Sequence, residues 1–124
     1  MIRGALLALA ALVLAAAAPT WAGQLDSGVR GRVLYGPTCP VQRVGESCTR
    51  PYQATIVIRR EPSNRVLTRT RSSLRGNFSV RLAPGRYLLV PQSGRPYPRS
   101  QPQTIAVHPH RYTFVTIRYD SGIR

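Results

Sequence analysis

Residues 76–89 read Gly76-Asn77-Phe78-Ser79-Val80-Arg81-Leu82-Ala83-Pro84-Gly85-Arg86-Tyr87-Leu88-Leu89, and this stretch decides the fold class. Every second residue from Phe78 to Leu82 is apolar. Because successive side chains of a β-strand point to opposite sides, this alternation predicts a strand with one buried face. Pro84 fixes φ and Gly85 accepts a positive φ, so the pair predicts a turn. The stretch therefore predicts two strands joined by a tight turn.

The same pattern recurs along the chain after residue 28, where short runs of β-branched and aromatic residues stand between turn residues. No window of 11 or more residues there has a 3.6-residue apolar period, so helix is not expected. The pattern predicts an all-β fold, a seven-strand antiparallel β-sandwich, with an open or closed barrel as the main alternative. A proline-rich, irregular connection is expected over residues 92–103. The predicted strands are Val29 to Tyr35, Gln53 to Arg59, Arg65 to Thr70, Phe78 to Leu82, Tyr87 to Val90, Thr104 to Val107 and Arg111 to Tyr119.

Residues 76–89 resemble the G-x-F-x-V-x-L-x-P-G-x-Y-x-L signature of carboxypeptidase regulatory-like domains. The segments Gly36-Pro37-Thr38-Cys39-Pro40-Val41 and Cys48-Thr49-Arg50-Pro51-Tyr52-Gln53-Ala54, and the tail Tyr119-Asp120-Ser121-Gly122-Ile123-Arg124, look like small exported bacterial members of this group. The resemblance implies a transthyretin-like (prealbumin-like, Ig-like) seven-strand sandwich that serves as an accessory, structural or binding module. One departure is the turn Ser73-Leu74-Arg75, where the family often carries an acidic residue.

The N-terminus has the layout of a cleavable signal peptide. Arg3 precedes an apolar run of 14 residues from Ala5 to Ala18, and small residues follow up to Ala22. A transmembrane helix needs roughly 20 apolar residues, so a retained anchor is the weaker interpretation. We expect residues 1–22 to be a signal peptide. Residues 23–124 are then one domain, exported to the periplasm or secreted, with 102 residues and no transmembrane segment after cleavage.

Cys39 and Cys48 are the two cysteines of the sequence and predict a disulfide bond. Paired thiols in exported chains usually become oxidised. The bond would close a loop of about ten residues and contribute about 3 kcal/mol on the chain-entropy model. A metal pair or a nucleophilic cysteine is the rival interpretation, and it needs ligands or a base that the neighbouring sequence does not offer.

The chain is a strongly basic protein, because its 18 basic residues are all arginine and stand against four acids, for a net charge of +14. The absence of lysine is explained most simply by arginine-biased codon usage. The excess of positive charge instead points to anions, since the planar arginine fork donates two parallel hydrogen bonds to phosphate, sulfate or carboxylate. Outward arginines also discourage edge-to-edge strand pairing, a role that needs no ligand. The predicted anion-binding residues are Arg30, Arg32, Arg59, Arg69, Arg71 and Arg81.

The sequence predicts no catalytic residues, no metal ligands and no cofactor. Four acids, two histidines and no lysine offer few acid, base or nucleophile combinations. His108 and His110 are two apart and could begin a metal site, but Pro109 separates them and the sequence places no third ligand nearby. Enzymatic relatives of transthyretin, which hydrolyse a purine-pathway intermediate, end in Tyr-Arg-Gly-Ser. This chain ends in Asp120-Ser121-Gly122-Ile123-Arg124, so the resemblance does not imply that activity.

We therefore expect a non-enzymatic, exported accessory or structural module whose partner is an unknown exported protein. Tyr52, Tyr97 and the proline-rich connection would then supply the contact surface. The alternative is an arginine-rich binding module for an anionic cell-envelope or extracellular polymer, such as a polysaccharide, a lipid head group or an acidic partner. Nucleic acid is the weakest of these expectations, because the chain has no recognised nucleic-acid motif.

Overall fold

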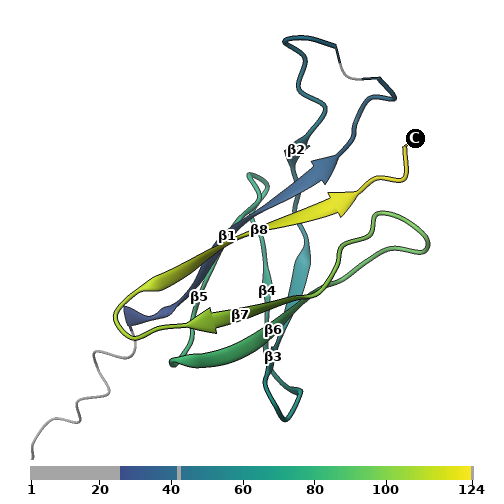
Figure 1. The fold of residues 1–124 in the computed structure, drawn as a ribbon. Coiled ribbons are helices and arrows are strands. Elements are labelled where there is room, and N and C mark those ends of the chain that lie inside the picture. The colour runs from purple at the N-terminus through teal and green to yellow at the C-terminus, as the bar shows by residue number, and fades with distance from the viewer. Residues whose placement is uncertain (1–25, 42, 124) are drawn as a thin grey trace, which may run out of the picture.

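The computed structural model describes residues 26–41 and 43–123, which form two β-sheets packed face to face (Figure 1). The first sheet contains β1 (Gly28–Gly36), β2 (Arg50–Pro51), β5 (Asn77–Arg81) and β8 (Tyr112–Asp120). The second sheet has the order β4 (Arg65–Arg71), β3 (Thr55–Arg60), β6 (Gly85–Pro91) and β7 (Gln103–Val107). The predicted all-β sandwich is confirmed, and its seven predicted strands agree with the observed bounds to within two residues. The short β2 is an additional strand.

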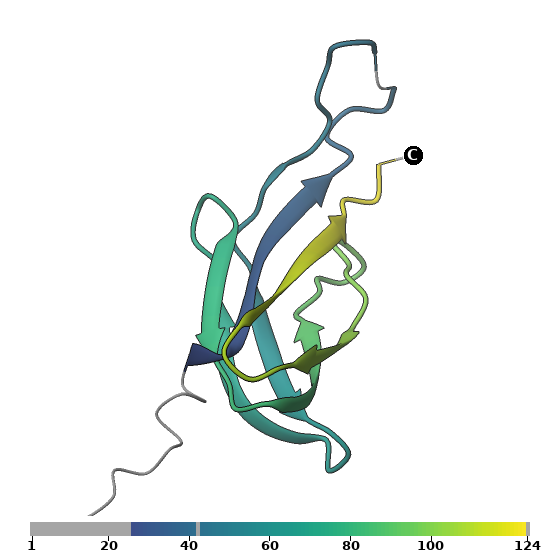
Figure 2. The same ribbon diagram turned by 60° about the vertical axis from the view of Figure 1, so that its left-hand side comes forward.

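The strand β1 lies at the centre of the first sheet. It pairs antiparallel with β5 and β2 on one side and parallel with β8 on the other. The first and last strands of the sandwich therefore lie side by side, as Figures 1 and 2 both show. Although β7 and β8 are consecutive, they belong to different sheets, so the chain crosses between the sheets over residues 108–111. Thr113 donates to the carbonyl oxygen of Ala106 over 2.6 Å, which ties these two strands together.

The core lies between the sheets, where the alternating residues of each strand meet. Val29 and Val33 of β1 and Ile56 and Ile58 of β3 are fully buried at 0% exposure. Each such side chain stabilises the fold by roughly 1.5–3 kcal/mol through removal from water. Gly31 leaves room for an aromatic ring, since a Cβ atom there would lie 2.5 Å from the ring of Phe78. The remaining core side chains are Ala54, Leu82, Tyr87, Leu89, Ile105, Val107, Val115, Ile117 and Tyr119.

The predicted disulfide between Cys39 and Cys48 is present, with the two Cα atoms 5.5 Å apart. Its loop connects β1 to β2 and extends beyond the end of the sandwich (Figures 1 and 2). A disulfide in a small domain is typical of a protein that folds outside the cytoplasm. Within the described ranges, no helix has the length and apolar character needed to cross a membrane. The predicted signal peptide, residues 1–22, lies outside the described residues.

A candidate anion-binding face

Strand register decides which side chains share the outer side of the first sheet. Val29 and Val33 point into the core, so Arg30 and Arg32 point outward on β1. Residues that pair directly opposite each other lie on the same side of a sheet. Their partners on β5 and β8 therefore complete one outer surface, which we call the first-sheet face. Its side chains are Arg30, Arg32, Leu34, Asn77, Ser79, Arg81, Tyr112, Phe114, Thr116 and Arg118.

These side chains form four rows that run across the strands. Neighbouring rows are about 6.7 Å apart, because every second residue of a strand shares a side. At the end of β1 nearest the disulfide, Gly36 pairs with Asp120. The next four rows hold Pro51, Leu34 and Arg118, then Asn77, Arg32 and Thr116, then Ser79, Arg30 and Phe114, and finally Arg81, Gly28 and Tyr112. Each of these four rows thus contains one arginine.

Arg30 is held on this face by an aromatic ring. Its Cζ atom lies 4.9 Å from the ring centroid of Tyr112, within the range of a cation–π interaction. Gly28 makes space for that ring, because a Cβ atom at Gly28 would lie 2.9 Å from Tyr112 Cε1 and 2.0 Å from the carbonyl oxygen of Val80. The guanidinium group of Arg30 carries five N–H donors, from which an anion could accept hydrogen bonds.

Phe114 lies beside Arg30 in the same row and is 66% exposed. Together with Arg30, Asn77 and Ser79 it lines a shallow hollow of about 340 Å³. Covering an exposed apolar ring with a ligand is favourable, because it removes the ring from water. The hollow therefore combines a cation, two polar side chains and an apolar platform on one surface.

The acidic residues lie away from the centre of this face. Asp26 precedes β1, Glu46 lies in the disulfide loop, and Glu61 lies in the turn between β3 and β4. Asp120 ends β8 and lines a second hollow with Arg118 and Tyr97. The three rows that contain Arg30, Arg32 and Arg81 hold no carboxylate, so their positive charge is not balanced within the face.

Three of the six predicted arginines lie on the other side of the molecule. Arg69 pairs with Val57, Arg71 with Thr55 and Arg59 with Leu88, all on the outer side of the second sheet, which we call the second-sheet face. The six predicted anion-binding arginines are therefore divided between two faces. The alternation along each strand correctly indicates that these arginines point outward. It does not indicate which sheet the strand joins, because that depends on pairing between distant segments.

Arg59 has a packing role on the second-sheet face. Its register places it between Val66 of β4 and Leu88 of β6, and it is half-buried. Within the described part of the chain, its Nε atom is buried without a hydrogen-bond partner. A buried arginine stem covers apolar surface, so Arg59 contributes to packing on this face.

Among the residues of the first-sheet face that sequence reasoning misses are three on β8: Tyr112, Phe114 and Arg118. A signal for them was available in the predicted strand 111–119. Val115 and Ile117 mark its buried side, so the alternate positions must face outward. That alternation alone would have placed the ring of Phe114 on the surface.

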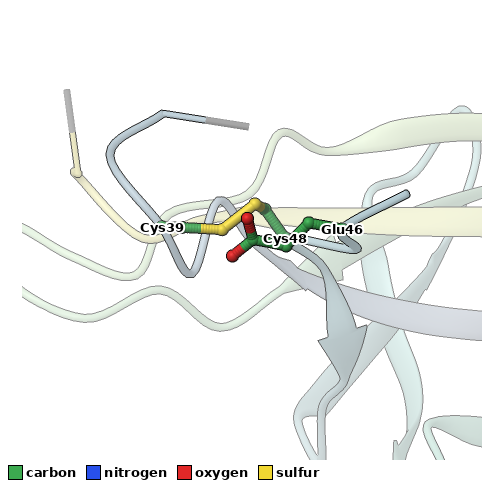
Figure 3. A group of neighbouring side chains, drawn as sticks. All are labelled: Cys39, Glu46 and Cys48. Atoms are coloured by element: carbon green, nitrogen blue, oxygen red, sulfur yellow. A yellow bond between two sulfur atoms is a disulfide. The ribbon is translucent and has the colours of Figure 1, made fainter. Parts of the chain in front are cut away.

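Cys39, Glu46 and Cys48 form a small group at the base of the disulfide loop, with their potential ligand atoms within 4.8 Å of one another (Figure 3). Metal ions bind the thiolate form of cysteine. The two sulfur atoms are joined to each other in the disulfide, so neither is available as a thiolate. His108 and His110 are exposed in the turn between β7 and β8, and no third ligand accompanies them among the described residues.

No protein-family model matches this chain, and comparison with curated proteins gives no significant match.

Proposed function

We propose that this protein is a non-enzymatic, exported β-sandwich module of the carboxypeptidase regulatory-like type, and that its first-sheet face binds an anionic envelope or extracellular polymer. The observation that carries the proposal is the register of β1 with β5 and β8. That register places exposed Arg30, Arg32 and Arg81 on the same face as the exposed ring of Phe114. Arginines whose charge no neighbouring carboxylate balances attract anions, and the exposed ring adds contact area.

Two further features support an extracellular or periplasmic ligand. The leader resembles a signal peptide, and the disulfide of Cys39 and Cys48 is typical of oxidising compartments. Anionic polymers of the cell envelope are accessible there. The resemblance of residues 76–89 to accessory modules supports a binding role rather than catalysis.

The first prediction compares matched arginine pairs on the two faces. Arg30 and Arg32 are exposed and two apart on β1, and Arg69 and Arg71 are exposed and two apart on β4. We expect the double variant Arg30→Gln/Arg32→Gln to lose tenfold or more in affinity for polygalacturonate, polyphosphate or anionic vesicles. The variant Arg69→Gln/Arg71→Gln removes the same charge and should stay close to the unmodified protein. Titration calorimetry at about 50 and 200 mM salt measures this, and binding should weaken with salt.

Neutral dextran serves as the control polymer and should not bind. An equal loss in both double variants would show that only net charge matters and would contradict a specific face. Binding that does not change with salt would also contradict the proposal, because charge–charge attraction is screened.

A second candidate function is docking of a partner protein at the disulfide end. Tyr35, Arg50, Tyr52 and Pro98 line a hollow of about 360 Å³. The ring centroids of Tyr35 and Tyr52 lie 5.4 Å apart, and the Cζ atom of Arg50 lies 5.9 Å from the ring centroid of Tyr35. Aromatic and arginine side chains are the typical anchors of protein interfaces. Binding there would tolerate salt and would be unchanged by Arg30→Gln/Arg32→Gln, which separates it from the first proposal.

A further inference from the structure

The arginines of the first-sheet face form a continuous diagonal line. Arg118 lies on β8, Arg32 and Arg30 on β1, and Arg81 on β5, and the four occupy successive rows. With rows about 6.7 Å apart, the line extends about 20 Å along the sheet. We call these four residues the arginine track. All four side chains are exposed.

Polar and aromatic side chains flank the arginine track on both sides. Asn77 and Ser79 lie beside Arg32 and Arg30 on β5, while Thr116 and Phe114 lie beside them on β8. The side chains of Asn77, Ser79 and Thr116 can donate hydrogen bonds to neutral hydroxyl groups and accept them. The face therefore offers three kinds of contact: charge, hydrogen bonding to hydroxyls, and an apolar ring.

We propose that the ligand of this face is a linear acidic polysaccharide, which lies extended along the arginine track. This inference rests on the proposed function of the same face. Carboxylate or sulfate groups would accept hydrogen bonds from successive arginines. The ring of Phe114 would pack against one sugar ring, and Asn77, Ser79 and Thr116 would bind hydroxyl groups of the adjoining units.

The side chains favour a polysaccharide over other polyanions. Single-stranded nucleic acids stack successive bases on several aromatic rings. Among the described residues of this face, Phe114 is strongly exposed, whereas Tyr112 is half-buried and Arg30 lies over its ring. Polyphosphate has neither rings nor hydroxyls to match Phe114, Asn77 and Ser79. A membrane surface calls for an exposed apolar patch larger than one ring.

The second prediction uses oligogalacturonates of increasing length, titrated into the oxidised protein by calorimetry. We expect affinity to rise with length until the chain spans about 20 Å, and then to level off. The slope of log K against log salt should be about −3 for a ligand that meets all four arginines, and each Arg→Gln change on the track should reduce its magnitude by about 0.7. Arg118→Gln is the decisive variant, since its row lies farthest from Phe114. Arg69→Gln on the second-sheet face is its matched control.

Phe114→Ala tests the ligand class. We expect it to weaken oligogalacturonate binding roughly three- to tenfold and to leave polyphosphate binding unchanged. Its side chain is largely exposed, so the fold should be retained, which a thermal unfolding curve checks.

The outcomes separate the two proposals. If short and long oligogalacturonates bind with equal affinity, or if Arg118→Gln changes neither affinity nor salt slope, the arginine track is wrong. The proposed binding of anions to the first-sheet face would still hold. Tighter binding of single-stranded DNA or polyphosphate, with no effect of Phe114→Ala, would overturn the polysaccharide assignment alone. If no acidic polymer binds, both this inference and the proposed function fail.

Discussion

The hydroxyl group of Tyr119 lies beneath the proline-rich connection, where it donates a hydrogen bond to the carbonyl oxygen of Gln92 over 2.7 Å. Burial, and to a smaller extent the nearby Tyr52, raises the pKa of Tyr119 from 10.0 to about 12. The unfolded chain therefore releases this proton near pH 10, whereas the folded protein keeps it up to about pH 12. Between these values the folded state binds more protons. We expect the free energy of unfolding to fall as the pH rises from 10 toward 12, and urea titrations across this range measure it.

The variant Tyr119→Phe is the control for this third prediction. It has no phenolic proton, so its stability should lose this part of the alkaline dependence. It also leaves the carbonyl oxygen of Gln92 without this donor, which should lower stability by about 1 kcal/mol at neutral pH. Tyr97→Phe, at a tyrosine that is 40% exposed, should keep the alkaline decrease. If the free energy of unfolding of Tyr119→Phe falls just as much over this pH range, the decrease comes from other ionisable groups.

At the scale of the elements, the turn between β7 and β8 carries the chain from one sheet to the other. His110 in this turn has a left-handed backbone with φ 61°, which costs a residue with a Cβ atom about 1 kcal/mol. The fourth prediction is that His110→Gly raises the free energy of unfolding by a few tenths to about 1 kcal/mol, as measured by urea titration. His108→Gly is the matched control, because His108 lies outside the left-handed region. It should lower stability slightly by loosening the unfolded chain, and a gain at both positions would contradict the backbone explanation.

The elements were largely predictable from the sequence, whereas their pairing was not. Alternation over Phe78 to Leu82 and over Ala54 to Ile58 correctly indicates strands and their buried sides, because burial acts on every second residue. Val57 is an exception: it belongs to the outer side of its strand yet is only 6% exposed, since neighbouring side chains cover it. The parallel pairing of β1 with β8 brings Phe114 beside Arg30 across 84 positions of the chain. No local pattern carries that information, so the composition of the first-sheet face appears only in the folded structure.

At the scale of the whole molecule, the sandwich is small for the charge it carries. The net charge of the whole chain is +14, and arginines lie on both outer faces, on opposite sides of one thin core. Like charges repel across and along these faces, which works against the compact state. Salt should therefore have opposite effects on stability and on binding: it screens the repulsion within the fold and weakens the attraction of an anionic ligand. A fold with this repulsion benefits from a covalent tie.

The disulfide is that tie, and it lies away from Arg30 and Arg81 of the arginine track. Cys39 and Cys48 join the two sides of the loop beyond the end of β1, whereas Arg30 and Arg81 lie near the other end of the first sheet. The fifth prediction is that the double variant Cys39→Ser/Cys48→Ser loses about 3 kcal/mol of unfolding free energy, because the unfolded chain regains the entropy of an open loop. That is a large share of the 5–15 kcal/mol typical of a single domain. Urea titrations of the variant, and of the unmodified protein with and without reductant, measure the loss. Reduction should have no further effect on the stability of the variant.

The same variant tests whether the loop takes part in binding. At urea concentrations below its unfolding transition, the folded variant should bind polygalacturonate as the unmodified protein does. Lost binding in a fully folded variant would show that the loop itself takes part in recognition, and would move the binding site from the first-sheet face toward the disulfide end.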